Sequence, residues 1–131
     1  MRLLLDTHIV LWSLLEPGRL SPEVRQHLGD PGNELWISPI SVWEMAVLAE
    51  KGRVLIDAPD PTVWIRDMLS RAPLREATLT HEVALQSRCV NLGHQDPADR
   101  FIAATAMVYD LVLVTADRRL LAAALLQTMA S

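Results

Sequence analysis

Short apolar runs alternate with segments of helical character along this chain, and that alternation limits its possible folds more than any other feature. The runs at residues 2–5, 34–38, 74–79 and 111–114 have the length of buried strands. Capped or amphipathic segments of helical periodicity separate them. Such alternation predicts a parallel sheet with helices on both faces. At this length, we expect one α/β domain over residues 1–131.

The composition excludes several classes of protein. Half of the residues are apolar and 21% are charged, which is typical of a globular chain rather than a disordered one. No apolar run reaches the roughly 18 residues that a membrane span needs, and the N-terminus lacks the layout of a secretory signal. Cys89 is the only cysteine, so an internal disulfide and a thiolate metal cage are excluded. We therefore expect a cytoplasmic protein with no membrane partner.

The charged residues do not identify the class of binding partner. The net charge is −4, which does not indicate a nucleic-acid-binding protein. Eleven of the twelve basic residues are arginine, however, and Lys51 is the one lysine. Arginine binds phosphate through a two-pronged guanidinium group, but a GC-rich genome would also favour arginine over lysine.

Residues 96–106 have the pattern of a helix start that carries two acids. Asp96 is a residue type that caps helices, Pro97 is tolerated at the first helical position, and Asp99 falls in the first turn. The helix dipole favours negative charge there. Taken alone, the stretch predicts a well-capped helix and nothing more.

The positions of the other acids suggest a second interpretation. Asp6 follows the first expected strand and Asp117 follows the last, and ligands of open parallel sheets bind at the carboxyl ends of strands. Glu44 and Asp99 lie one turn into helices that open beside the same edge. We therefore expect these four acids to converge, with Asp96 nearby.

Clustered carboxylates repel one another unless protons or a cation neutralise them. Hard divalent ions such as Mg²⁺ or Mn²⁺ prefer oxygen ligands, and such an ion activates water for the hydrolysis of a phosphodiester. Each acid also has a purely structural interpretation. Glu44 completes a capping box with Ser41, Asp96 and Asp99 decorate a helix start, and Asp117 caps a last helix over residues 120–126.

Four segments together resemble a known family, the PIN-domain ribonucleases, and within it the VapC-type toxins of bacterial toxin–antitoxin pairs. The resemblance spans nearly the whole chain and rests on Leu3-Leu4-Leu5-Asp6-Thr7-His8, Ser41-Val42-Trp43-Glu44, Asp96-Pro97-Ala98-Asp99-Arg100-Phe101-Ile102-Ala103-Ala104-Thr105-Ala106 and Leu113-Val114-Thr115-Ala116-Asp117. It implies a three-layer α/β/α fold with a central parallel sheet. It also implies a Mg²⁺- or Mn²⁺-dependent endoribonuclease that forms homodimers and is neutralised by a cognate antitoxin.

Carried onto this sequence, the resemblance assigns the catalytic, metal-binding acids to Asp6, Glu44, Asp99 and Asp117. Thr115 matches a polar position that supports the site, and Thr7 could serve likewise. Asp96 is an additional acid that is a ligand, a partner of the ligands or only a cap. Ala116 stands where relatives often have a basic residue, so contact with RNA phosphate is expected from Arg118 or Arg119, and Arg100 either contacts phosphate or neutralises the acids.

Other residues have less specific interpretations. His8, His81 and His94 lack the spacing of metal ligands, and His94 lies nearest to the acids. Trp36 and Trp43 lie in apolar runs and are expected in the core.

Two alternative functions remain open at this stage. One is a regulatory module that binds a partner without catalysis, in which the acids are caps. The other is a phosphohydrolase for small substrates with Asp6 as nucleophile. Such enzymes generally need a second acid two residues further on, where this chain has His8.

Overall fold

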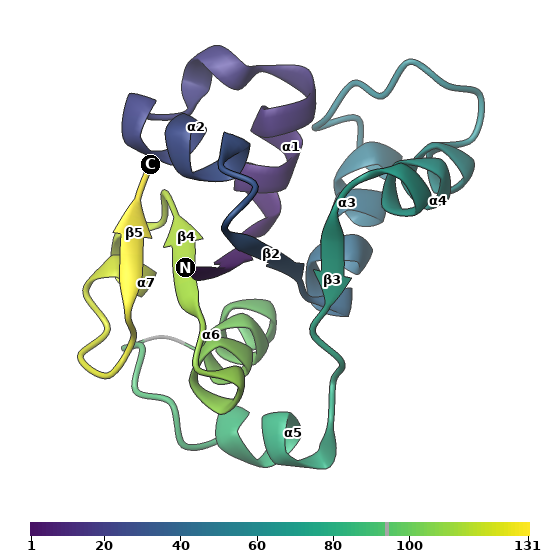
Figure 1. Cartoon of the computed structure of the whole chain (residues 1–131). Coiled ribbons are helices and arrows are strands. Elements are labelled where there is room, and N and C mark those ends of the chain that lie inside the picture. The colour runs from purple at the N-terminus through teal and green to yellow at the C-terminus, as the bar shows by residue number, and fades with distance from the viewer. Residues whose placement is uncertain (94) are drawn as a thin grey trace.

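The structure, a computed structural model, describes residues 1–93 and 95–131, so His94 lies outside the described residues. Strands and helices alternate along the chain (Figure 1). The strands are β1 (Arg2–Leu5), β2 (Glu34–Ile37), β3 (Leu74–Glu76), β4 (Val112–Thr115) and β5 (Thr128–Ala130). The helices are α1 (Thr7–Leu15), the short 3₁₀ helix η1 (Pro17–Arg19), α2 (Pro22–Gly29), α3 (Pro39–Glu50), α4 (Pro61–Arg71), α5 (His81–Ser87), α6 (Pro97–Tyr109) and α7 (Arg118–Leu121).

Within the described residues, the five strands form one parallel sheet in the order β3-β2-β1-β4-β5. Leu3 of the central strand β1 pairs with Leu35 of β2 on one side and with Val112 of β4 on the other. The chain first builds outward from β1 to β3 and then returns to β4 on the opposite side of β1. The strand order therefore reverses between β1 and β4, which is where ligands of such sheets bind.

The side chains of β1 alternate between two apolar clusters, one on each face of the sheet. Leu3 and Leu5 belong to a cluster with α1 to α4, whereas Leu4 belongs to a cluster with α5, α6 and α7. Figure 1 shows α1 and α2 on one side of the strands and α6 with α5 on the other. The predicted three-layer α/β/α arrangement is confirmed. No helix in the described part of the chain is long and apolar enough to cross a membrane.

The start of α3 differs from the prediction. Ser38 is the N-cap, because its Oγ accepts the backbone N–H of Ile40 at 3.0 Å, and Pro39 occupies the first helical position. Ser41 is fully buried inside the helix, so the predicted capping box of Ser41 with Glu44 is wrong. The carboxylate of Glu44 therefore does not cap α3.

The outward face of α3 gives a second correction. Trp43 is 59% exposed, although the sequence placed it in the core. Met45 is fully buried on this helix, and a side chain two positions away lies on another face. The apolar run that contains Trp43 therefore does not identify the buried side chains.

The segment at residues 122–127 forms turns and loop where a helix was predicted. Helix α7 ends at Leu121, and the predicted helix over residues 120–126 is wrong. The chain instead adds β5, whose Thr128 pairs with Leu113 of β4. This pairing gives hydrogen-bond partners to backbone groups at the open edge of β4. Local helical propensity does not predict such a pairing between distant segments. Strand β3 is also shorter than the predicted residues 74–79.

Candidate active site

Six acidic side chains line one cavity of about 850 Å³ at the point where the strand order reverses. They are Asp6, Glu16, Glu44, Asp96, Asp99 and Asp117. Asp6 directly follows β1 and Asp117 lies two residues beyond β4, while Asp99 lies in the first turn of α6. The structure therefore brings together the acids that the sequence predicted to converge.

Thr115 links the acids that follow β1 and β4. Its fully buried hydroxyl donates to Oδ2 of Asp6 at 2.7 Å and accepts the backbone N–H of Asp117 at 3.0 Å. The other oxygen of Asp6, Oδ1, accepts the N–H of Thr7 at 2.8 Å and caps α1. Both oxygens of Asp6 are therefore held in place, one by the end of β4 and the other by the first residue of α1.

Glu44 is oriented by a second threonine. The hydroxyl of Thr7, which is 1% exposed, donates to Oε1 of Glu44 at 2.8 Å. This bond joins the first residue of α1 to the middle of α3. Thr7 thus fixes one carboxylate oxygen of Glu44, as Thr115 fixes one of Asp6.

Asp96 caps α6, as its residue type predicted. Its Oδ1 accepts the backbone N–H of Ala98 at 3.0 Å and that of Asp99 at 3.5 Å. Asp117 caps α7 in the same way, because its Oδ1 accepts the N–H of Arg119 at 2.8 Å. Capping and convergence are therefore both properties of these acids, and a cap interpretation does not exclude a role in the cavity.

Burial and the crowding of carboxylates disfavour the ionised form of three acids. Burial, reinforced by the charges of the surrounding carboxylates, raises the pKa of Asp99 to about 7. Burial also raises the pKa of Asp6 and of Glu44, although the hydrogen bonds from Thr115 and Thr7 oppose it. Burial alone would raise the pKa of Asp117 too, but hydrogen bonds from Arg119 hold that pKa below its ordinary value.

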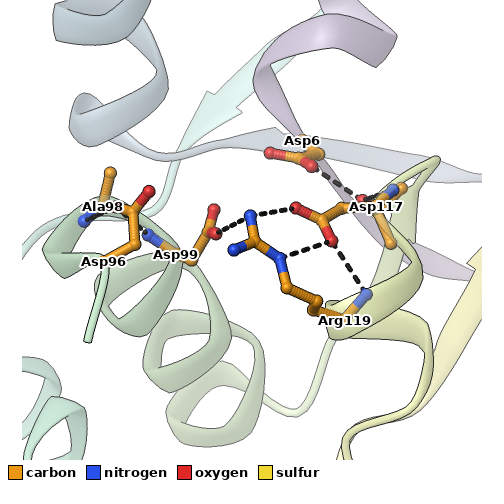
Figure 2. A network of polar contacts seen from close by, with 7 residues as sticks. Asp6, Asp96, Ala98, Asp99, Asp117 and Arg119 are labelled. Atoms are coloured by element: carbon orange, nitrogen blue, oxygen red, sulfur yellow. Dashed lines mark hydrogen bonds and ion pairs between the residues drawn. The ribbon is translucent and has the colours of Figure 1, made fainter. Parts of the chain in front are cut away.

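The guanidinium group of Arg119 reaches into the acid cluster (Figure 2). Its Nη2 lies 3.4 Å from Oδ2 of Asp117 and 3.6 Å from Oδ2 of Asp99. The sequence offered Arg119 only as an alternative to Arg118. In the structure Arg119 lines the cavity, whereas Arg118, its neighbour at the start of α7, is absent from the described lining.

Arg100 lies away from the cavity lining. Its side chain is 7% exposed, and its Nε donates to the backbone oxygen of Ser87 at 2.9 Å. This bond joins α6 to the end of α5. The position indicates a structural role in the layer on that face of the sheet, so phosphate contact is better sought among arginines that line the cavity.

The cavity extends beyond the acids into a wall that the sequence did not predict. Trp12 and Arg19 form one part of it, with the guanidinium carbon of Arg19 4.4 Å from the centre of the Trp12 ring. Arg53 and Leu55 form another part, from the loop after α3. A loop that folds back over a distant helix leaves no periodic signal, so sequence spacing could not reveal this wall.

The chemistry of the donors fits Mg²⁺ or Mn²⁺. Carboxylate and hydroxyl oxygens surround the centre of the cluster, and hard divalent ions prefer such ligands. Among the described residues, no three or more histidine, cysteine or acidic side chains are placed so that together they could hold a metal ion. Mg²⁺ does not require such a group, because it typically binds one or two carboxylates directly and keeps several waters.

Comparisons with known proteins agree with this fold. The family model for the PIN domain matches residues 3–126. The chain therefore belongs to the PIN-domain family. Within that family it is 36% identical to ribonuclease VapC22 of Mycobacterium tuberculosis over 118 residues, which cover 89% of this chain and 88% of that protein.

Solved structures share the fold. The chain matches VapBC2 of Rickettsia felis, a complex bound to a DNA fragment from its promoter, with a TM-score of 0.73 and 17% identity over 100% of this chain and 99% of that one. It matches a toxin–antitoxin complex from Klebsiella pneumoniae with a TM-score of 0.68 and 22% identity over 97% and 95% of the two chains. The expected resemblance to PIN-domain proteins of the VapC type is confirmed.

Proposed function

We propose that this protein is a divalent-metal-dependent endoribonuclease toxin of the VapC type. The observation that carries the proposal is the convergence of Asp6, Glu44, Asp99 and Asp117 on one cavity where the strand order reverses. The relative in M. tuberculosis is a ribonuclease, which supports RNA as the substrate class.

Each site residue has a defined task in this proposal. The four carboxylates hold Mg²⁺ or Mn²⁺, directly or through its waters, and Asp96 supports them from the cap of α6. Thr115 and Thr7 fix the oxygens of Asp6 and Glu44. When bound, the ion lowers the pKa of an attacking water and offsets charge at the phosphorus.

The cavity wall supplies contacts to the RNA chain. Arg19 and Arg53 line the same cavity as the acids and can bind phosphates on either side of the bond that is cut. Trp12 presents an aromatic surface next to Arg19, where a base can stack. Arg118 and Arg100 have no place in this contact set, because neither lines the described cavity.

A cognate antitoxin and a homodimer complete the proposal. A matching structure from K. pneumoniae is a toxin–antitoxin complex, which supports a protein partner for this chain as well. Trp43 and Val63, 59% and 57% exposed on the neighbouring helices α3 and α4, offer apolar area to a second copy. We place the activity in the cytoplasm, and light scattering of the purified chain tests the dimer.

The geometry disfavours the two alternatives weighed from the sequence. A phosphohydrolase would need Asp6 as a nucleophile, yet both of its oxygens accept hydrogen bonds from the protein. Lys51, the one lysine of the chain, is not part of the described cavity lining. A non-catalytic module would explain the caps but not why Glu44, which caps nothing, joins the cluster.

The experiment is cleavage of total cellular RNA by the purified chain, free of antitoxin. Reactions contain Mg²⁺ or Mn²⁺, or a chelator, and Asp6→Asn serves as the control for contaminating nucleases. We expect discrete cuts that require both the metal and Asp6. Cuts that persist in chelator or in the variant would overturn the proposal.

A further inference from the structure

The guanidinium group of Arg119 lies where two acids from different elements meet. Asp117 is the cap of α7, the helix that carries Arg119, whereas Asp99 comes from the first turn of α6. A single nitrogen, Nη2, is 3.4 Å from one carboxylate and 3.6 Å from the other. Figure 2 shows the guanidinium between Asp99 and Asp117. Arg119 therefore bridges α6 and α7 across the mouth of the cavity.

The two carboxylates lie among other acidic side chains. Six acids line the cavity, and the charges of Asp96, Asp117, Asp6 and Glu44 all act against ionisation of Asp99. Arg19, another arginine of the lining, is directed to Glu16 at 3.7 Å and to the ring of Trp12. Arg119 thus supplies positive charge at the centre of the cluster.

We propose that Arg119 is an internal counter-ion that competes with the divalent metal for Asp99 and Asp117. The inference rests on the proposed metal site. The guanidinium group lies 3.4–3.6 Å from the facing oxygens of these two acids. A metal ion bound to the same oxygens would occupy the same space and would be attracted by the same negative charge. Binding of the metal therefore requires Arg119 to withdraw.

The side chain of Arg119 is free to move away from the two acids. The side chain of Arg119 is 57% exposed, while that of Asp99 is only 12% exposed, so the arginine can swing toward solvent and the acid cannot. Exposed ion pairs are weak, and a pair of this type typically changes an equilibrium constant by a factor of roughly two to five. Arg119 then lowers metal affinity modestly while it stabilises the metal-free fold.

The test is calorimetric titration of Mn²⁺ and Mg²⁺ into the metal-stripped, full-length chain. Arg119→Gln is compared with the parent and with Arg118→Gln, which removes a neighbouring arginine that does not line the cavity. We expect Arg119→Gln to bind metal about two- to fivefold more tightly and to melt at a lower temperature without metal. Arg118→Gln should match the parent in metal affinity.

A merely structural arginine would give a different pattern. Metal affinity that is equal or weaker in folded Arg119→Gln would overturn the inference and leave the metal site intact. Failure of the parent and of both variants to bind either metal would overturn the metal site itself and the inference with it.

A measurement on the parent protein avoids any folding defect of the variant. The side-chain Nε–H of Arg119 is followed by NMR during a titration with Mg²⁺. Its resonance should move as the metal binds, and that of Arg118 should stay nearly constant. A stationary Arg119 resonance at saturating metal would contradict the displacement.

Discussion

The hydroxyl of Thr115 donates to Oδ2 of Asp6 at 2.7 Å, so a residue at the end of β4 fixes the acid that follows β1. These strands are neighbours in the sheet and mark the reversal of strand order. The same hydroxyl accepts the N–H of Asp117 at 3.0 Å. One side chain therefore sets the spacing between two acids that are more than a hundred residues apart.

Replacement of Thr115 tests this link. Thr115→Val keeps the shape but removes the donor to Asp6, which should lower the free energy of unfolding by about 1–3 kcal/mol. It should also lower RNA cleavage roughly 10- to 100-fold, as is typical when a partner of metal ligands is lost. Urea denaturation and initial cleavage rates measure the two effects. Thr115→Ser retains the hydroxyl and should stay near the parent; equal loss in both variants would contradict the role of the hydrogen bond.

Thr7 offers an independent test at Glu44. Thr7→Val removes the 2.8 Å hydrogen bond to Glu44 and should reduce cleavage roughly 10-fold or more. The fold should persist, because the backbone N–H of residue 7 still donates to Oδ1 of Asp6, the N-cap of α1. Initial rates at several Mg²⁺ concentrations measure the effect, with Thr7→Ser as the matched control. A Thr7→Val protein as active as the parent would show that Glu44 needs no orientation.

The pH dependence of stability reports on Asp99 in the metal-free protein. The folded-state pKa is about 7, above the ordinary value of 3.8, so between these values the native state holds a proton that the unfolded state has released. Stability must therefore fall as the pH rises from about 4 to 7 and change little from this group above that. Asp6 and Glu44, whose pKa values are also raised, act in the same direction.

Asp99→Asn should remove the Asp99 part of this dependence. At pH 8 without metal, the variant should be more stable than the parent by on the order of 4 kcal/mol, since the folded-state pKa lies about three units above the ordinary value and one pKa unit corresponds to about 1.4 kcal/mol. At pH 4 the two proteins should be nearly equal. Urea denaturation at several pH values, in chelator, measures the difference. A difference that is constant across the range would contradict the assigned pKa.

Arg100 is expected to matter for stability rather than for RNA. Arg100→Gln removes the buried bond from Nε to the oxygen of Ser87 and should cost about 1–3 kcal/mol. At a low temperature, at which the variant is folded, its KM for RNA should equal that of the parent. Thermal unfolding and initial rates separate these effects, and an intact melting temperature with a raised KM would instead indicate phosphate contact.

The sequence was informative where local rules and global topology agree. The alternation of runs predicted the parallel sheet, and acids at strand ends predicted a cluster because parallel strands end at one edge. Asp96 and Asp117 were predicted as caps, and both cap helices in the structure. These features depend on residue type and spacing, which the sequence contains.

Other features depend on contacts between distant segments. Strand β5 forms because β4 has an open edge, and no local pattern near Thr128 states this. Trp43 is exposed because the buried face of α3 is set by its neighbours and not by the apolar run. Arg119 is the instructive case: its spacing two residues after Asp117 was visible, but its contact with Asp99 required the packing of α6 beside α7.

The central claim is that four acids from separate elements share one divalent cation, and metal-induced thermal stabilisation tests it without knowledge of the RNA target. A ligand that binds only the folded state raises the melting temperature. The melting temperature is measured against Mg²⁺ and Mn²⁺ concentration for the parent and for Asp6→Asn, Glu44→Gln, Asp99→Asn and Asp117→Asn. Glu82→Gln is the matched control, because Glu82 is an acid in the first turn of α5 outside the described cavity lining.

If the four acids share the cation, metal raises the melting temperature of the parent and of Glu82→Gln alike, and each of the four site variants loses most or all of the rise. A site variant such as Asp6→Asn that responds to metal as the parent does would contradict the shared site.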